Sequence, residues 1–140
     1  KRVGAGSIGK LKRAKSANIG VCCPPVYMSQ AFLKALDQLM LSMPEGVRLL
    51  FIDIAYASPQ SCDRVRNTLT LPESRVEFLA PEDYLDTIDL MNELDLLVDT
   101  FPHSSGIRLL EAKHMKLPVY LFPFDRQLFC ERQAIAYSLA

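Results

Sequence analysis

Short apolar runs alternate with amphipathic stretches along this chain, and the alternation predicts its secondary structure. The run Val47–Ile54 (VRLLFIDI) is almost continuously apolar, as is typical of a parallel strand covered on both faces. The stretch Phe32–Met40 instead spaces its apolar residues three and four apart, which is the spacing of one helix face. By this reasoning we expect five strands: Asn18–Cys23, Val47–Ile54, Arg75–Leu79, Leu94–Asp99 and Pro118–Phe122.

Helices are expected between these strands. Ser29 is a suitable N-cap for the first of them, and Pro44–Gly46 should end it. Pro81 is expected at the first position of a later helix, with Glu82 and Asp83 in its first turn, where the helix dipole favours acids. The helices predicted after the first are Ser61–Leu69, Pro81–Met91, Ile107–Met115 and Glu131–Leu139.

This regular alternation predicts an α/β fold with one parallel sheet of about five to six strands and helices on both faces. Right-handed crossovers make such a sheet Rossmann-like. Ligands bind these sheets at the carboxyl ends of the strands, near the point where the strand order reverses, so we expect a site in the loops after the first and fourth strands. The expected core residues are Val21, Leu49, Phe51, Leu96, Leu97 and Val119.

Composition narrows the class of protein. The 140 residues suit one domain, and no apolar run approaches the roughly 20 residues that span a membrane. The first residue is Lys1, which suggests a piece of a longer chain, and no secretory signal pattern follows it. The four cysteines form no C-x-x-C pair, so we expect reduced, buried thiols in a cytoplasmic protein, with adjacent Cys22 and Cys23 on opposite faces of the sheet.

The basic residues are concentrated at the start of the chain. Six of the 16 lie within the first 15 positions, where there is no acid. We interpret residues 1–17 as a basic, glycine-containing linker to a domain at 18–140, and we expect no nucleic-acid partner, because the acidic remainder offers no second basic surface. Gly4–Gly9 matches the G-x-G-x-x-G dinucleotide fingerprint but lacks a preceding strand and a following helix, so an unrelated nucleotide-binding domain is the weakest interpretation.

The most informative stretch is Asp95–Leu121, in which a polar loop joins a strand to a helix. The loop His103–Gly106 (HSSG) enters a helix N-terminus, whose free N–H groups suit a phosphate. Glu111 lies about one turn further in and could accept hydrogen bonds from both hydroxyls of a ribose. The alternative is structural: Ser104 or Ser105 caps the helix, and Glu111 is a surface carboxylate.

The same stretch resembles the donor-binding region of GT-B glycosyltransferases, most of all the O-GlcNAc transferase/SPINDLY group and the bacterial enzymes that glycosylate adhesins. Sequences of that group commonly run "aDv.LDtfPyngttt..EaLwmGvPvv", and Leu94–Pro102 matches the first part of this pattern. Glu111-Ala112, Met115 and Leu117–Val119 match the second part. The resemblance implies half of a GT-B fold: the C-terminal donor domain of an enzyme that moves a sugar from a UDP-sugar to a protein acceptor.

The resemblance also implies roles for individual residues. No metal or other cofactor is needed, and the acceptor base is expected in an N-terminal domain of the same chain. The diphosphate would lie on Ser104, Ser105 and Gly106, and the ribose on Glu111. The uracil would meet the backbone after Phe78. The donor-binding residues expected on this basis are His103, Ser104, Ser105, Gly106, Arg108, Glu111, Phe78 and Leu79.

The chain also departs from the pattern of that group. Tyr27 stands where the group has a lysine that neutralises the leaving diphosphate, and Lys116 replaces the glycine of "wmGvP". A second interpretation follows from these departures, in which the domain is a degenerate, non-catalytic binding or assembly module.

Overall fold

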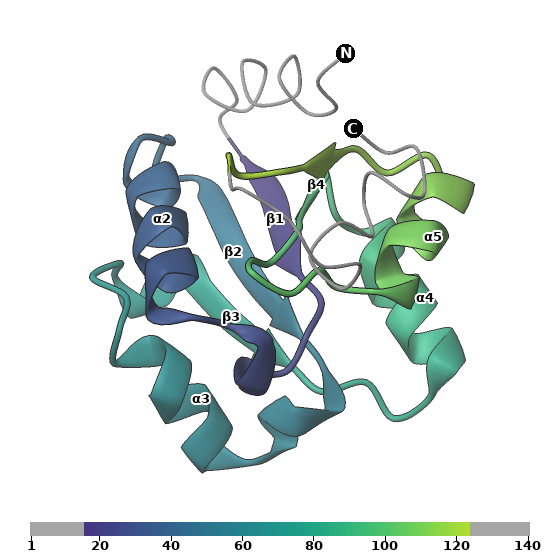
Figure 1. Cartoon of the computed structure of the whole chain (residues 1–140), viewed down its shortest axis with the longest axis horizontal. Helices are drawn as coiled ribbons and strands as arrows, with labels where there is room; N and C mark the ends of the chain where they lie inside the picture. The colour runs from purple at the N-terminus through teal and green to yellow at the C-terminus, as the bar shows by residue number, and fades with distance from the viewer. Residues whose placement is uncertain (1–15, 124–140) are drawn as a thin grey trace.

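The structure is a computed structural model and describes residues 16–123. A fully parallel sheet forms its centre (Figure 1). Its strand order is β3-β2-β1-β4-β5, so the chain builds outward from β1 in one direction and then in the other. The predicted α/β, Rossmann-like fold is therefore confirmed. The strands are β1 (Ala17–Val21), β2 (Val47–Ile52), β3 (Val76–Leu79), β4 (Leu96–Val98) and β5 (Val119–Tyr120).

Among residues 16–123, two pairs of α-helices cover the two faces of this sheet. Helices α2 and α3 lie on one side and α4 and α5 on the other (Figure 1). The α-helices are α2 (Gln30–Leu41), α3 (Pro59–Arg66), α4 (Tyr84–Asn92) and α5 (Ile107–His114). Short 3-10 helices are η1 (Pro25–Tyr27), η2 (Ile54–Ala57) and η3 (Glu73–Arg75). No helix within residues 16–123 is long and apolar enough to cross a membrane.

Alternation along each strand divides the core into two clusters. In β2, Leu49 and Phe51 pack beneath α2 and α3, whereas Leu50 and Ile52 pack beneath α4 and α5. Both clusters are apolar, which explains why the strand reads as a continuous apolar run. The core residues expected from the sequence are all fully buried: Val21, Leu49, Phe51, Leu96, Leu97 and Val119.

The paired cysteines follow the same alternation. Cys22 belongs to the cluster under α4 and α5, and Cys23 to the cluster under α2 and α3, as predicted. Both are free and buried, as expected. Cys62 is also free but only half-buried, so the expectation that all the cysteines are buried is wrong for this residue. The fourth cysteine, the basic arm and the predicted helix Glu131–Leu139 lie outside the described residues.

The start of α4 differs from the prediction. Pro81 does not begin the helix; Asp83 is its N-cap, and the Asp83 carboxylate accepts a hydrogen bond from the Asp86 amide at 2.9 Å. A carboxylate cap fixes a helix start more strongly than a proline does, because it satisfies an N–H group that the helix leaves free. Glu82 therefore lies in the loop before the helix. The predicted N-cap of α2, Ser29, is confirmed by its hydrogen bond from the Phe32 amide.

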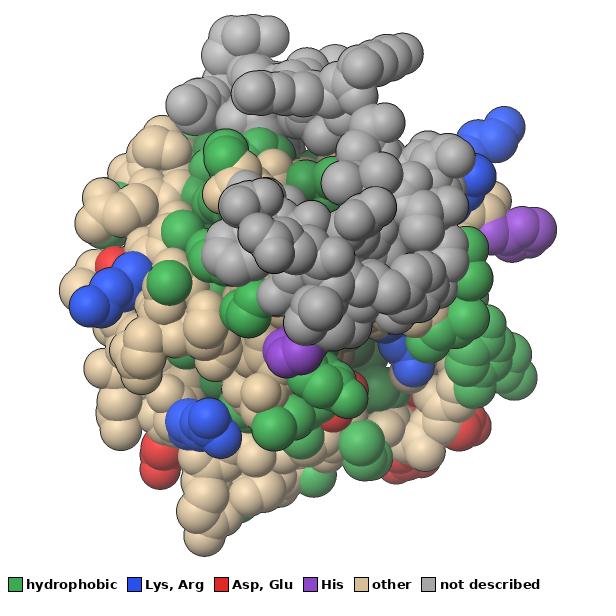
Figure 2. Space-filling view, in the orientation of Figure 1, with side chains coloured by type: hydrophobic (Ala, Val, Ile, Leu, Met, Phe, Trp, Pro, Cys, Tyr) green, Lys and Arg blue, Asp and Glu red, His purple; other side chains and the backbone are tan. Residues whose placement is uncertain are grey.

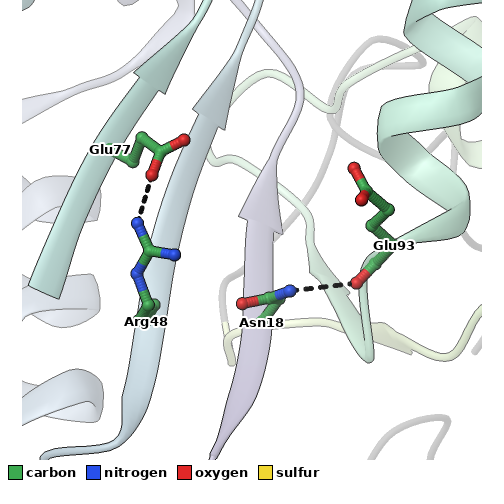
Figure 3. A network of polar contacts seen from close by, with 4 residues as sticks. All are labelled: Asn18, Arg48, Glu77 and Glu93. Atoms are coloured by element: carbon green, nitrogen blue, oxygen red, sulfur yellow. Dashed lines mark hydrogen bonds and ion pairs between the residues drawn. The ribbon is translucent and has the colours of Figure 1, made fainter.

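Polar contacts tie neighbouring elements together at the strands (Figure 3). Arg48 on β2 forms an ion pair with Glu77 on β3, and the Asn18 side chain on β1 donates to the Glu93 carbonyl at 3.2 Å. The Asn18 amide also donates to the Asp95 carboxylate at 2.8 Å. The two Asn18 contacts fix the turn between α4 and β4 against the start of β1.

One glycine in β1 is closely packed by a leucine side chain. A β-carbon added at Gly20 would lie 2.3 Å from Cδ1 of Leu94, which is far inside van der Waals contact. The missing side chain lets the turn after α4 pack directly on the strand. The turn after α4 therefore lies close against β1.

A lysine occupies a position that favours glycine. Lys116 follows α5 with a φ of 60°, in the left-handed region. A residue with a β-carbon is strained there by about 1–2 kcal/mol, whereas glycine is not, although glycine loses more backbone entropy on folding. We expect Lys116→Gly to stabilise the domain by about 0.5–1 kcal/mol in urea melts.

A second lysine provides the matched control. Lys113 lies in the last turn of α5 with helical backbone, so Lys113→Gly should destabilise by about 1 kcal/mol. The two changes remove the same type of side chain from positions three residues apart, which have different backbone conformations. Equal destabilisation by both would contradict the argument.

Candidate functional site

The reversal of strand order lies between β1 and β4, and the loops that leave these strands meet there. The Ser29 hydroxyl, after β1, donates to the Phe101 carbonyl, after β4, at 3.0 Å. The rings of Tyr27 and His103 lie 6.3 Å apart across the same junction. The structure therefore brings together the two loops expected from the sequence.

Aromatic side chains of the core pack against the base of the loop after β4. Phe32 of α2 packs edge-to-face on Phe101, at 5.5 Å between centroids, and on Phe122, at 5.9 Å. Phe101 and Phe122 also contact each other at 5.8 Å. Because Phe101 belongs to the loop after β4, the core of the domain holds the base of that loop.

Internal hydrogen bonds fix the shape of the loop itself. Asp99 is fully buried, and its carboxylate accepts a hydrogen bond from the Ser105 amide at 2.7 Å. The Thr100 hydroxyl donates to the His103 carbonyl. The Ser105 amide is thus already used inside the protein, whereas the Ser105 hydroxyl is buried without a hydrogen-bond partner among the described residues. His103 is exposed and Ser104 is buried.

The N-terminus of α5 has no side-chain cap. Gly106 is the N-cap residue, with a φ of 67° that favours glycine, and it has no side chain with which to bond the first-turn amides. Capping of the helix by the Ser105 hydroxyl is therefore wrong, because that hydroxyl has no hydrogen-bond partner among the described residues. The first N–H groups of α5 retain the partial positive charge that attracts anions.

Glu111 lies one turn into α5 and is buried, so the surface-carboxylate alternative is also wrong. Its side chain is 8% exposed, and Oε1 forms an ion pair with Arg108, whose side chain is 25% exposed. Oε2 is buried and makes no hydrogen bond of normal geometry to a described residue. The exposed Tyr84 lies close enough that hydrogen bonding to Glu111 raises the pKa of its hydroxyl.

A buried thiol lies beneath this ion pair. Burial raises the pKa of Cys22 to about 12, with Arg108 lowering it and then Glu111 and Asp53 raising it. Asp53, Arg108 and Glu111 therefore lie within electrostatic range of Cys22. A neutral, buried thiol is unreactive, so Cys22 is not a candidate nucleophile.

Two cavities adjoin the Arg108–Glu111 pair, one on each side. A cavity of about 360 Å³ contains Arg108 together with Asp53, Glu82 and Asp83 in its lining. A groove of about 520 Å³ runs between α4 and α5 and contains Glu111 in its lining. Tyr84 lines both. Apolar side chains gather over the region of α4 and α5 in Figure 2, as the groove lining suggests.

The two predicted residues on β3 lie apart from the loop. Phe78 stacks on Phe51 at 5.2 Å between centroids and lies under the Arg66 guanidinium, as part of the core beneath α2 and α3. The Leu79 carbonyl already accepts a hydrogen bond from the Asp53 amide at 3.1 Å. The free backbone that could meet a ligand therefore begins after Leu79, where Pro81 lines the 360 Å³ cavity.

Sequence reasoning missed three residues of this region: Tyr84, Asp53 and Asp99. Asp53 and Asp99 each come directly after a strand, so the rule that ligands bind at carboxyl ends could have singled them out. Tyr84 carries no such signal, because its place beside Glu111 depends on how α4 packs against α5. Within residues 16–123 no cluster of histidine, cysteine, aspartate or glutamate could hold a metal ion.

Comparisons with known proteins identify the fold. No protein-family model matches the sequence, and no curated protein matches it. Among solved structures, the chain is similar to a lysine-to-methionine mutant of the O-GlcNAc transferase of Thermobaculum terrenum, with a TM-score of 0.66 and 22% identity over 90% of this chain. The chain spans 24% of that protein's length. The domain thus has a glycosyltransferase-like, Rossmann-type fold, consistent with half of a GT-B fold.

Proposed function

We propose that this chain is the donor-binding domain of a longer cytoplasmic glycosyltransferase, which moves a sugar from a UDP-sugar to a protein acceptor. The acceptor and its catalytic base would lie on an N-terminal domain of the same chain. The proposal needs no metal or other cofactor, because the helix N-terminus and nearby side chains would balance the diphosphate charge.

The observation that carries this proposal is the state of α5 at the reversal of strand order. Its N-terminus is uncapped, and one turn further along it carries a buried carboxylate with an unsatisfied oxygen. Buried polar atoms in folded proteins nearly always have partners, so an unsatisfied hydroxyl and carboxylate oxygen in one region favour a ligand site. A helix N-terminus that can bind phosphate and, one turn later, an acid that can bind hydroxyl groups together suit a nucleoside diphosphate.

Each part of the donor would have its own contacts. The diphosphate would lie on the Ser105 hydroxyl and the amides after Gly106, with His103 at the exposed side. The ribose hydroxyls would bind Glu111. The uracil would meet the backbone that follows Phe78 and Leu79. The proposed donor site comprises His103, Ser104, Ser105, Gly106, Arg108, Glu111, Phe78 and Leu79.

Glu111→Ala should weaken UDP binding at least tenfold. Hydrogen bonds to a charged group are worth roughly 1.5–3 kcal/mol, and about 1.4 kcal/mol corresponds to a factor of ten in affinity. Isothermal titration of UDP into wild type and variant measures the loss. Ser105→Ala should also weaken UDP binding, and because Ser105 does not cap α5, it should cost little stability in melts.

Glu77 gives the matched control for Glu111. It forms an Arg–Glu ion pair with Arg48 on the sheet, away from α5, so Glu77→Ala should leave UDP affinity unchanged. Tight UDP binding that neither Glu111→Ala nor Ser105→Ala reduces would refute the donor-site assignment.

Tyr27 favours a second candidate function, a binding module without transferase activity. It is exposed at the junction, beside His103, where the resembled group has a lysine for the leaving diphosphate. A module of this kind would bind UDP without turning over a UDP-sugar. Donor hydrolysis by the longer protein, measured beside UDP binding, separates the two functions.

A further inference from the structure

Arg108 pairs with one acidic residue and shares a cavity with three others. Its guanidinium pairs with Glu111 on one side. On the other side, Arg108 is the only cationic residue among the described residues that line the 360 Å³ cavity, and Asp53, Glu82 and Asp83 line that cavity with it. The positive charge of Arg108 is thus matched by several nearby negative charges.

This arrangement does not suit a phosphate. A diphosphate in the 360 Å³ cavity would share it with three acidic residues and one guanidinium, and like charges repel. It does suit a carboxylate that must stay ionised in a buried position. A buried charge is costly unless it is paired, and the ion pair with Arg108 supplies the partner for Glu111.

The ion pair with Arg108 also leaves the two carboxylate oxygens of Glu111 with different hydrogen bonding. Oε1 is held by Arg108, so the carboxylate cannot turn freely. Oε2 is buried without a hydrogen bond of normal geometry, and Glu111 lines the groove between α4 and α5. A ribose hydroxyl that arrives from the groove would compete for this carboxylate with the Tyr84 hydroxyl, whose pKa is raised by hydrogen bonding to Glu111.

We propose that Arg108 is a positioning residue, which holds Oε1 of Glu111 so that Oε2 can accept a ribose hydroxyl, and that it does not bind the diphosphate. The inference rests on the proposed function and assigns Arg108 a different part in it. A guanidinium is suited to this task because it is always charged and holds a carboxylate in a fixed orientation.

The two halves of the donor, used as separate probes, test the inference. Uridine carries the ribose without phosphate, and inorganic pyrophosphate carries the phosphate without ribose. NMR titration of the 140-residue chain measures both affinities. Arg108→Gln should weaken uridine binding roughly tenfold, through loss of the charge-assisted geometry of Glu111, and should leave pyrophosphate binding within about twofold of wild type.

Three controls sharpen the result. Arg108→Lys keeps the charge without the planar fork and should recover part of the uridine affinity. Arg48→Gln breaks the other Arg–Glu pair, on β2 and β3, and should change neither affinity. With 2′,3′-dideoxyuridine, which lacks the hydroxyls, Arg108→Gln and wild type should bind equally weakly.

The outcomes distinguish this inference from the proposed function. Weaker pyrophosphate binding by Arg108→Gln, with uridine binding unchanged, would make Arg108 a phosphate ligand and overturn the inference alone. Equal uridine affinity in wild type, Arg108→Gln and Arg108→Lys would also overturn it. Failure of wild type to bind UDP, uridine and pyrophosphate would remove the proposed function, and the inference with it.

Discussion

Phe32→Ala should destabilise the domain by about 3–5 kcal/mol, the usual cost of removing a buried phenylalanine. Phe32 is fully buried and packs edge-to-face on Phe101 and Phe122, so its loss leaves a cavity at the centre of an aromatic cluster. Such aromatic pairs add about 0.5–1.5 kcal/mol beyond the area that they bury. Urea melts of wild type and variant measure the difference.

The same helix supplies the control for Phe32. Leu41 lies at the end of α2 and is 50% exposed, so Leu41→Ala should cost well under 1 kcal/mol, as surface changes usually do. A small loss for Phe32→Ala, comparable to that for Leu41→Ala, would show that the aromatic cluster is packed differently.

Arg75→Met should cost at least about 3 kcal/mol, because it removes several hydrogen bonds from one buried cation. The Arg75 side chain donates to the carbonyls of Met40, Pro44 and Val47, at 3.0–3.2 Å. Methionine matches the length of the chain but leaves these buried acceptors without a donor. The end of α2 and the start of β2 lose their common partner. The measurement is again the free energy of unfolding in urea.

Arg64 provides a comparison of the same residue type. It is exposed on α3, so Arg64→Met should change stability by no more than about 0.5 kcal/mol. Arg75→Lys should fall between wild type and Arg75→Met, because one ammonium group cannot reproduce the guanidinium fork. If Arg75→Met were as stable as wild type, the carbonyls would have to be satisfied without Arg75.

The fold could be predicted from the sequence because the sheet is buried on both faces. Continuous apolar runs marked β2 and β4, and helical spacing marked α2, so strand number and layering followed. Boundaries were less accurate where a side chain, rather than hydrophobicity, decides them. Asp83 caps α4 and thereby leaves Pro81 in the loop. The strands are also shorter than their apolar runs, since β4 spans only Leu96–Val98.

The candidate site was predictable only in part. The polar loop before α5 and the acid one turn later could be found, because both lie along one segment of the chain. The Arg108–Glu111 pairing was within reach as well, since residues three apart on a helix are neighbours. Tyr84 and Asp53 could not be placed beside them, because that proximity depends on how α4 and β2 pack against α5.

The Ser29 hydroxyl oxygen connects the first turn of α2 to the loop after β4. It accepts a hydrogen bond from the Phe32 amide at 3.0 Å and donates its proton to the Phe101 carbonyl, also at 3.0 Å. A displacement of the loop after β4 therefore pulls on the oxygen that holds the first turn of α2. We therefore expect opening of the loop and fraying of that turn to be coupled, so that each makes the other easier.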